Sequence, residues 1–172
     1  IDFRTAGLSL YDSVLLMNLG GAALSGPGYW ASGGVPGGDS SGDATISAAQ
    51  ALNLSAPNSG PDGIYRSYRN STSGVDGTMG WTFTLPDGEY TVRLHFIEPT
   101  YSAANQRRFD VSLQGAVVEA NLDIFARAGA RYQSLVLDYE VTVDAGAGIE
   151  LVLRNLTSNE AVVSGIEILR AN

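Results

Sequence analysis

The sequence contains no cysteine and no lysine, and it has a single histidine among 172 residues. The absence of cysteine excludes structural disulfides, thiolate metal sites and a cysteine nucleophile. A single histidine also excludes a histidine-rich metal site and a Cys/His catalytic dyad. No apolar run approaches the about 18 residues that a membrane-spanning helix needs. Several enzyme classes are therefore excluded at the outset, and this stretch of sequence predicts no membrane-spanning helix of its own.

Positive charge is also scarce. The ten basic residues are all arginine and are outnumbered by eighteen acidic residues, which gives a formal net charge of −8. Because this field repels phosphate backbones and anionic lipid headgroups, we expect neither a nucleic-acid nor a membrane partner. The acidic, lysine-free, Gly/Ser/Thr/Asn-rich composition predicts an extracellular or secreted protein. The chain begins with Ile1 rather than Met, and we interpret it as one part of a larger multidomain protein.

Short stretches of alternating apolar and polar residues are the main pattern in the sequence. Trp81, Phe83 and Leu85 alternate with threonines, and a Pro-Asp-Gly turn follows them. Further alternating or apolar stretches lie at residues 14–18, 90–96, 109–113, 135–143, 149–153 and 162–168. Helical signal is weak and confined to residues 47–54 and 124–128. The pattern predicts an all-β chain folded as a jelly-roll-like β-sandwich of two antiparallel sheets.

One glycine-rich segment interrupts this pattern. Nine of the 23 residues in 20–42 are glycine and two are proline. The segment is either a flexible surface loop or a binding loop. Tyr29 and Trp30 lie in its middle, where they either fill the core or present an aromatic platform to a ligand.

The residues do not indicate catalysis. His95 falls on the polar face of its predicted strand, so we expect it to be exposed on the surface. No G-x-S-x-G nucleophile motif is present. Carboxylates could support glycosidase chemistry, but among eighteen acidic residues some must lie near strand ends by chance. We therefore predict no enzyme activity, no catalytic residue and no cofactor.

Metal binding has equally little support. The Asp-Gly turns at Asp62-Gly63 and Asp76-Gly77 leave a structural Ca²⁺ open as an alternative, because turns of this kind can offer oxygen ligands. Ordinary turn chemistry explains the same residues. We predict no dedicated metal site.

Aromatic and amide side chains gather in two segments, residues 65–70 and 98–106. A pyranose ring presents an apolar C–H face that can stack on an aromatic ring, and hydroxyls that hydrogen-bond to amides, carboxylates and arginine. Tyr68 and Tyr101 offer such rings, and Asn70 lies close to the first of them. The combination favours binding of a carbohydrate.

Five ordered motifs then suggest a family. Val14-Leu-Leu-Met-Asn18-Leu-Gly20-Gly21 resembles the opening strand and Asn-x-Gly-Gly of malectin and malectin-like domains. Residues 64–69 are similar to that family's Tyr…Arg segment, and residues 90–98 to its Tyr-x-Val-x-Leu-x-Phe-Ala-Glu strand. Residues 108–125 contain counterparts of its paired Phe-Asp-Val and Asp-Ile-Phe segments, and residues 164–168 resemble its closing strand. The resemblance assigns residues 14–172 to a malectin-like carbohydrate-binding domain and leaves residues 1–13 as an extra strand or linker.

The resemblance implies a non-catalytic module that binds an oligo- or polysaccharide among loops at one end of the sandwich. Carried over position by position, the family's site falls on Trp30, Tyr68, Asn70, Glu98, Thr100, Tyr101 and Asn159. Asn70 stands where the family has a tyrosine, and the aspartate before the closing strand is missing near Asn159. The leading hypothesis is a module that tethers a larger secreted protein to a glycan, glucan among the candidates. The alternative is an adhesion or protein-interaction module that kept the fold and lost sugar binding.

Overall fold

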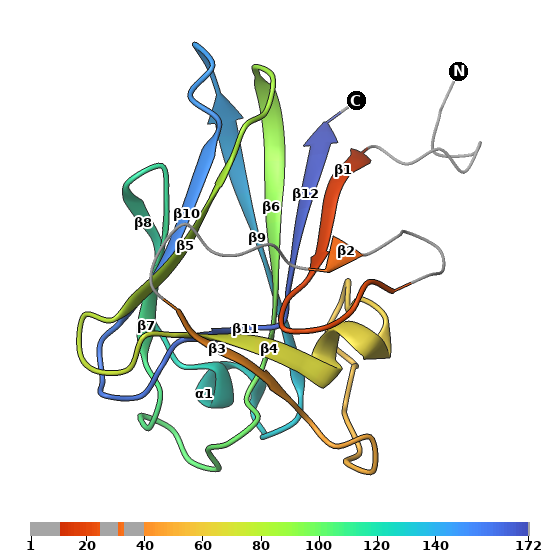
Figure 1. The fold of residues 1–172 in the computed structure, drawn as a ribbon, viewed down its shortest axis with the longest axis vertical. Coiled ribbons are helices and arrows are strands. Elements are labelled where there is room, and N and C mark those ends of the chain that lie inside the picture. The colour runs from red at the N-terminus through yellow and green to blue at the C-terminus, as the bar shows by residue number, and fades with distance from the viewer. Residues whose placement is uncertain (1–10, 25–30, 33–39, 172) are drawn as a thin grey trace.

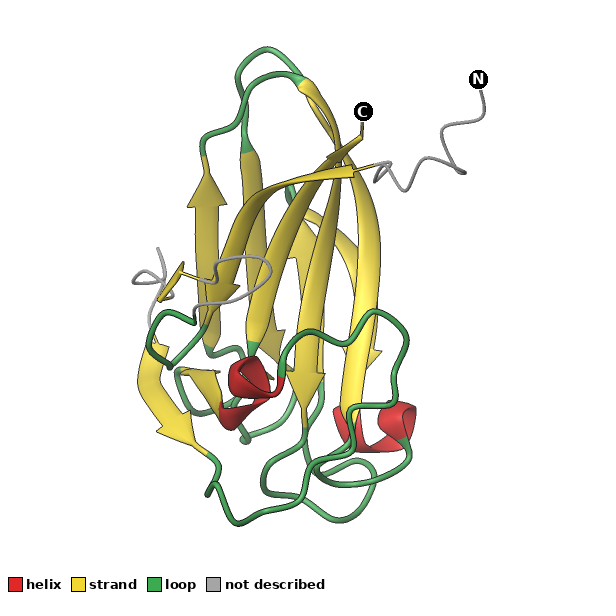
Figure 2. Cartoon of the chain, turned by 90° about the vertical axis from the view of Figure 1, so that its right-hand side faces the viewer, coloured by secondary structure: helices red, strands yellow, loops and turns green. Residues whose placement is uncertain are grey.

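Two antiparallel sheets form the body of the molecule, and the computed structural model describes them for residues 11–24, 31–32 and 40–171. The first sheet has the strand order β2-β1-β12-β6-β9, with β1 at Tyr11–Asn18, β2 at Ala31–Ser32, β6 at Gly88–Ile97, β9 at Ser134–Val143 and β12 at Gly165–Ala171. The second has the order β5-β10-β7-β8, with β5 at Thr78–Phe83, β7 at Phe109–Leu113, β8 at Ala116–Leu122 and β10 at Ile149–Asn155. Figures 1 and 2 show the long strands running in these layers. The predicted all-β sandwich is confirmed, although the short β1–β2 pair is parallel.

A third, three-stranded sheet was not expected from the sequence. Its order is β11-β4-β3, with β3 at Ser40–Thr45, β4 at Ser67–Ser71 and β11 at Val162–Val163. It lies across the lower part of the sandwich in Figure 1, next to the short 3₁₀ helix η2 at Asp62–Arg66. The sequence of β4, Ser-Tyr-Arg-Asn-Ser, is polar and lacks the alternation of apolar residues that would predict a strand.

The main core lies between the two large sheets and follows the period-two pattern of the sequence. In β10, Ile149, Leu151 and Leu153 are buried, while Glu150 and Arg154 face solvent. The rings of β6 and β7 meet across the core, with the centroids of Phe96 and Phe109 6.0 Å apart. Burial of this apolar surface is the main force that holds the sandwich together.

A second, smaller core corrects the prediction for His95. Ile46, Ile64, Tyr65 and Ile97 form a buried cluster on the face of β6 that turns away from the sandwich core. His95 lies on this face and is 0% exposed rather than at the surface. Its Nδ1 lies 2.8 Å from the Tyr65 hydroxyl and its Nε2 lies 2.7 Å from a Glu167 carboxylate oxygen. Residues that are distant in sequence, Ile46, Ile64 and Tyr65 among them, cover the face of β6 that the alternating pattern predicted to be exposed.

The helical expectations have mixed outcomes. Helix α1 forms at Ile124–Ala128, where Asp123 accepts a hydrogen bond from Ala126 N and Gly129 ends the helix at φ 93°. Both termini follow ordinary capping rules. Residues 47–54 form no helix, only a turn around residues 48–50.

The Asn-x-Gly-Gly motif joins β1 to β4. Asn18 Nδ2 donates to Ala22 O, and Ser67 Oγ donates to Asn18 Oδ1 at 3.1 Å. Gly20 has φ +73°, and a Cβ at this position would lie 2.5 Å from Tyr68 O. Only glycine meets both the backbone conformation and the close approach. The motif thereby brings β4, and Tyr68 with it, against the end of β1.

Two sequence expectations fall largely outside the described residues. The extra strand or linker expected at residues 1–13 overlaps the described residues only at its end, where β1 begins at Tyr11 and pairs with β12 in the register Tyr11↔Ala171. The Tyr29-Trp30 pair lies outside the described residues altogether.

Candidate functional site

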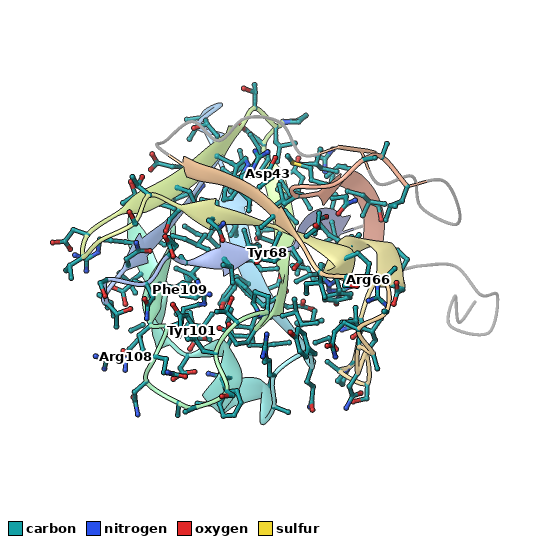
Figure 3. The ribbon with its side chains drawn as sticks, turned by 60° about the horizontal axis from the view of Figure 1, so that its bottom comes forward. Asp43, Arg66, Tyr68, Tyr101, Arg108 and Phe109 are labelled. Atoms are coloured by element: carbon teal, nitrogen blue, oxygen red, sulfur yellow. The ribbon has the colours of Figure 1, made fainter. Side chains whose placement is uncertain are left out.

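Four segments meet at the loop end of the sandwich, the lower end in Figure 1. Residues 98–101 follow β6, residues 105–108 precede β7, residues 156–161 join β10 to β11, and β4 lies beside them. Figure 3 looks toward this end and labels Tyr68 on β4 and Tyr101 in the loop after β6. We call the group Tyr68, Asn70, Glu98, Thr100, Tyr101, Arg107 and Asn159 the rim.

Arg107 is the centre of the rim. The side chain is almost fully buried, and Nε donates to Glu98 Oε2 at 2.8 Å. One terminal nitrogen donates to the carbonyl of Glu160. The guanidinium carbon lies over the Tyr101 ring, 4.9 Å from its centroid, which is within the range of a cation–π contact.

Glu98 is enclosed by the chain itself. The residue is 0% exposed, and Oε1 accepts hydrogen bonds from Thr100 N at 2.8 Å and Tyr101 N at 2.9 Å. With Oε2 paired to Arg107, both oxygens are engaged. In this structure Glu98 therefore shapes the loop and is not accessible to a ligand, although the sequence nominated it for ligand contact.

Tyr68 is half-buried between the two cores. Burial raises the pKa of its phenol above the ordinary value, and the nearby Thr100 side chain offsets part of that rise. Asn70 follows two residues later and lies on the same face of β4, because side chains alternate along a strand. Tyr68, Asn70 and Thr100 thus form one side of the rim.

Asn159 completes the other side. Its Nδ2 donates to Gln106 O at 2.5 Å, which joins the 156–161 segment to the residue before Arg107. Tyr68, Glu98, Thr100, Tyr101 and Asn159, five of the seven nominated residues, are thus grouped around Arg107. Trp30 lies outside the described residues.

Sequence reasoning missed Arg107, although a signal existed. Glu98 directly continues the apolar strand that ends with Phe96 and Ile97. A carboxylate so close to a buried strand needs a cation or several hydrogen-bond donors, because an unpaired buried charge is very costly. The Arg107-Arg108 pair before the Phe-Asp-Val motif was the nearest source of that cation.

The rim has little of what catalysis requires. The single histidine is buried against Tyr65 and Glu167 in the second core. In the described ranges, no group of three or more His, Asp or Glu side chains converges to hold a metal ion. The described helices include none long and apolar enough to span a membrane. What the rim offers is a partly exposed tyrosine backed by a guanidinium, an exposed threonine and an amide.

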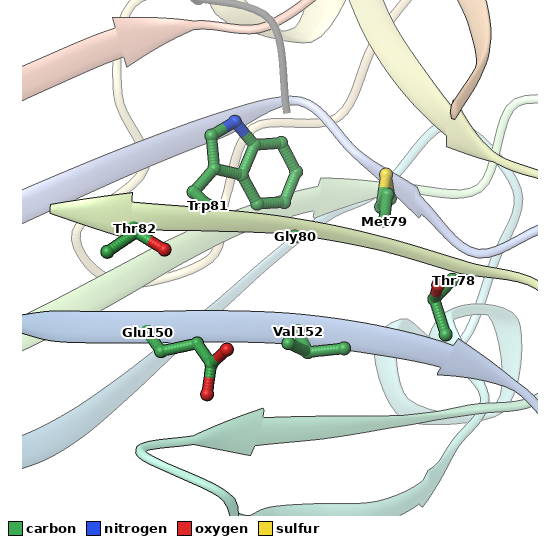
Figure 4. A pocket seen from close by; sticks show the side chains of 7 residues that line it. All are labelled: Thr78, Met79, Gly80, Trp81, Thr82, Glu150 and Val152. Carbon is green, nitrogen blue, oxygen red and sulfur yellow. The ribbon is translucent and has the colours of Figure 1, made fainter. Parts of the chain in front are cut away.

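Three surface depressions lie outside the rim. One of about 210 Å³ opens on the outer face of β5 and β10 around Gly80, and others of about 230 and 450 Å³ lie at β8–α1 and at the β9–β10 turn. Figure 4 shows the first, in which Trp81 and Met79 turn to the opposite side of the sheet from Glu150 and Val152. A Cβ on Gly80 would lie 2.9 Å from Leu151 O, so close strand packing accounts for this glycine. The depression presents hydroxyl, carboxylate and aliphatic groups, and the Trp81 ring turns away from it.

The fold and the rim together define a class, a β-sandwich domain with aromatic and amide side chains grouped at its loop end. The family model of the malectin domain matches residues 14–167. The chain therefore belongs to the malectin domain family, as its ordered motifs indicated.

Similar proteins carry the names of plant receptor-like proteins. Receptor-like protein 4 of Arabidopsis thaliana is 36% identical over 118 residues, which cover 66% of this chain and 18% of that protein. A putative receptor-like protein kinase of the same plant is 27% identical over 198 residues, covering 100% of this chain and 23% of the kinase. The chain thus spans less than a quarter of these two relatives.

Solved structures share the fold. The extracellular domain of ANXUR2 from Arabidopsis thaliana superposes with a TM-score of 0.80 at 19% identity, over 93% of this chain and 49% of that one. A structure of the plant peptide RALF23 in complex with FER and LLG2 matches with a TM-score of 0.76 at 21% identity, over 94% and 49%. The extracellular domain among these matches agrees with the extracellular localisation expected from the sequence.

Proposed function

We propose that this domain is a non-catalytic extracellular recognition module that binds a protein or peptide partner through the rim. The proposal rests on one observation: polar groups of the rim are hydrogen-bonded within the protein itself. Glu98 is enclosed, and the amide nitrogen of Asn159 is bonded to Gln106. A sugar site needs convergent polar groups that are free to meet hydroxyls. A partly exposed, rigidly backed tyrosine such as Tyr101 instead suits a protein interface, where Tyr and Arg dominate the binding energy.

The similar proteins also support binding of a protein or peptide partner. Two of the relatives are named as receptor-like proteins, and one structure of this fold was determined with a peptide and a second protein. The absence of catalysis is part of the proposal and is supported by the buried, hydrogen-bonded state of His95. The function proposed here is that of the alternative hypothesis from the sequence rather than of the leading one.

Binding of extracellular proteins to immobilised domain tests the proposal. We expect wild type to retain a protein or peptide that Tyr101→Ala loses, because the substitution removes the partly exposed ring. Val117→Ala is the matched control, since Val117 is 55% exposed on β8, outside the rim. Capture should persist in excess maltose and laminarin oligosaccharides. Release of the captured partner by these sugars, or equal retention by Tyr101→Ala, would contradict the proposal.

Carbohydrate binding remains a second candidate because of one observation. The Asn70 amide makes no side-chain hydrogen bond within the described residues, and Thr100 is exposed close to Tyr101. A free amide, a hydroxyl and a ring edge could bind one sugar unit, with a Kd of roughly micromolar to millimolar. A glycan array followed by calorimetry on wild type, Asn70→Ala and Tyr101→Ala tests this candidate. No binding across α-glucans, β-glucans and other plant polysaccharides would remove it.

A further inference from the structure

One guanidinium connects three separate loops of the rim. Arg107 bonds to Glu98 at the end of β6 and to the Glu160 carbonyl before β11, while its own backbone leads into β7. Asn159 adds a second bond between the last two segments through Gln106 O. Polar side-chain contacts therefore link all three segments, in addition to the backbone hydrogen bond from Leu156 N to Arg108 O that extends the β10–β7 pairing.

Burial fixes the partners of this arginine. Glu98 is 0% exposed and Arg107 is 4% exposed. Separating such a pair would leave a charge inside the protein without a counter-charge, which costs far more than breaking an exposed ion pair. The Glu98–Arg107 pair is therefore a rigid point in a loop region where residues 102–106 are exposed.

The same pair fixes both the backbone and the ring of Tyr101. Glu98 Oε1 accepts hydrogen bonds from the amides of Thr100 and Tyr101. The guanidinium of Arg107 covers one face of the Tyr101 ring. A chain of contacts thus runs from the buried carboxylate through the arginine to the exposed part of the rim.

We propose that Arg107, held by Glu98, is the positioning residue of the rim and presents Thr100 and Tyr101 in a preformed arrangement before any partner binds. The proposed function gives this role its purpose, since a pre-ordered tyrosine loses less entropy on binding than a mobile one. Arg107 itself need not touch the partner. Glu98 belongs to this support and is not a ligand contact.

Amide hydrogen exchange of the free, ¹⁵N-labelled domain tests the proposal without a partner. In Arg107→Lys the charge is kept, but an ammonium cannot bond Glu98 and Glu160 and stack on Tyr101 together. We expect the Thr100 and Tyr101 amides to exchange at least about tenfold faster, while amides of β6 and β12 change by less than about twofold. A purely structural arginine would accelerate exchange throughout the domain, because it would act on global stability.

A matched control and a second variant make the test decisive. Arg66 also pairs bidentately with a carboxylate, Asp62, and bonds the carbonyls of Ser47 and Gln50. Arg66→Lys should leave the amides of the rim unchanged. If Arg107→Lys fails to fold, the double variant Glu98→Gln with Arg107→Met removes both charges together and should show the same local acceleration.

Two outcomes would overturn the positioning role. They are unchanged exchange at Thr100 and Tyr101, or a uniform increase across the domain. Failure of the rim to bind any protein or glycan would instead count against the proposed function, and the exchange result would still stand on its own.

Discussion

Replacing Tyr65 with phenylalanine removes one hydroxyl group from the second core. That hydroxyl lies 2.8 Å from Nδ1 of His95, whose Nε2 contacts Glu167 at 2.7 Å. A carboxylate at this distance favours a proton on Nε2, so Nδ1 accepts the hydrogen bond from the phenol. Phenylalanine deletes this bond while keeping nearly the same volume.

The cost follows from the burial of His95. A buried polar group that loses its partner costs about 1–3 kcal/mol of unfolding free energy. For a domain of this length each kcal/mol lowers Tm by about 2–4 °C, so we expect Tyr65→Phe to lower Tm by about 2–12 °C. Tyr90→Phe is the control, because the Tyr90 hydroxyl donates to Pro86 O beside a turn, where water can replace it. Its cost should stay below about 1 kcal/mol.

The same variant makes a prediction for alkaline pH. Burial raises the pKa of Tyr65 from 10 to about 12. The folded state therefore favours the neutral phenol, and this stabilisation is complete below pH 10 and is lost as the pH rises toward 12. Two pKa units correspond to about 3 kcal/mol. Because phenylalanine cannot ionise, the stability difference between wild type and Tyr65→Phe should shrink by that amount between about pH 9 and pH 12.

Urea unfolding followed by circular dichroism measures both effects. The unfolding free energies of wild type, Tyr65→Phe and Tyr90→Phe are compared at neutral pH and then at increasing pH. A Tyr65→Phe variant as stable as Tyr90→Phe would refute the role assigned to the Tyr65–His95 bond. A stability difference that stays constant up to pH 12 would refute the ionisation argument.

Two further predictions concern glycine and glycosylation. Gly20→Ala should destabilise the domain more than Gly115→Ala in urea unfolding, since both have positive φ but only the first places a Cβ 2.5 Å from Tyr68 O. Gly115→Ala should cost about 1–2 kcal/mol for the backbone conformation alone, and an equal cost for Gly20 would contradict the close approach. Asn53-Leu54-Ser55 and Asn155-Leu156-Thr157 are both acceptor sequences for N-glycosylation. In a eukaryotic secretory host, mass spectrometry should find glycan on Asn53, which is exposed and whose Oδ1 accepts from Ser55 N. Asn155 should stay unmodified because it is fully buried and its Nδ2 donates to two carbonyls, and glycan there would refute this assignment.

Much of the fold was available from the sequence because apolar alternation reports directly on a sheet with one buried face. The alternating pattern correctly predicted which residues of β5, β6, β7, β10 and β12 face the core. It failed where a strand is covered on both sides, as at His95, because the covering segment comes from residues 46–66. It also failed for β4, whose polar residues are satisfied by strand pairing and by contacts with distant loops rather than by a core.

The candidate site, too, could be predicted only in part from the sequence. Motif order located Tyr68, Thr100 and Tyr101, which the structure does bring to one end. Sequence could not assign their interactions, since pairing between Glu98 and Arg107 depends on a loop that folds back. A carboxylate nominated for ligand contact is therefore buried, and the arginine that pairs with it was not nominated at all. Which polar groups remain free for a partner is a property of three-dimensional contacts, and residue type alone does not reveal it.

The pairing of β1 with β12 has a mechanical consequence. The two strands are antiparallel, and Tyr11 lies opposite Ala171 at the end of the sheet far from the rim. Tension applied through the chain at these two points would load the ladder one hydrogen bond at a time, as in opening a zipper, rather than all bonds in parallel. β1 would peel away at low force, and because Asn18 and Gly20 connect β1 to β4, the pull would reach the base of the rim last. Load applied at Tyr11 and Ala171 would therefore open the β1–β12 pair before it disturbed Tyr68 and Tyr101.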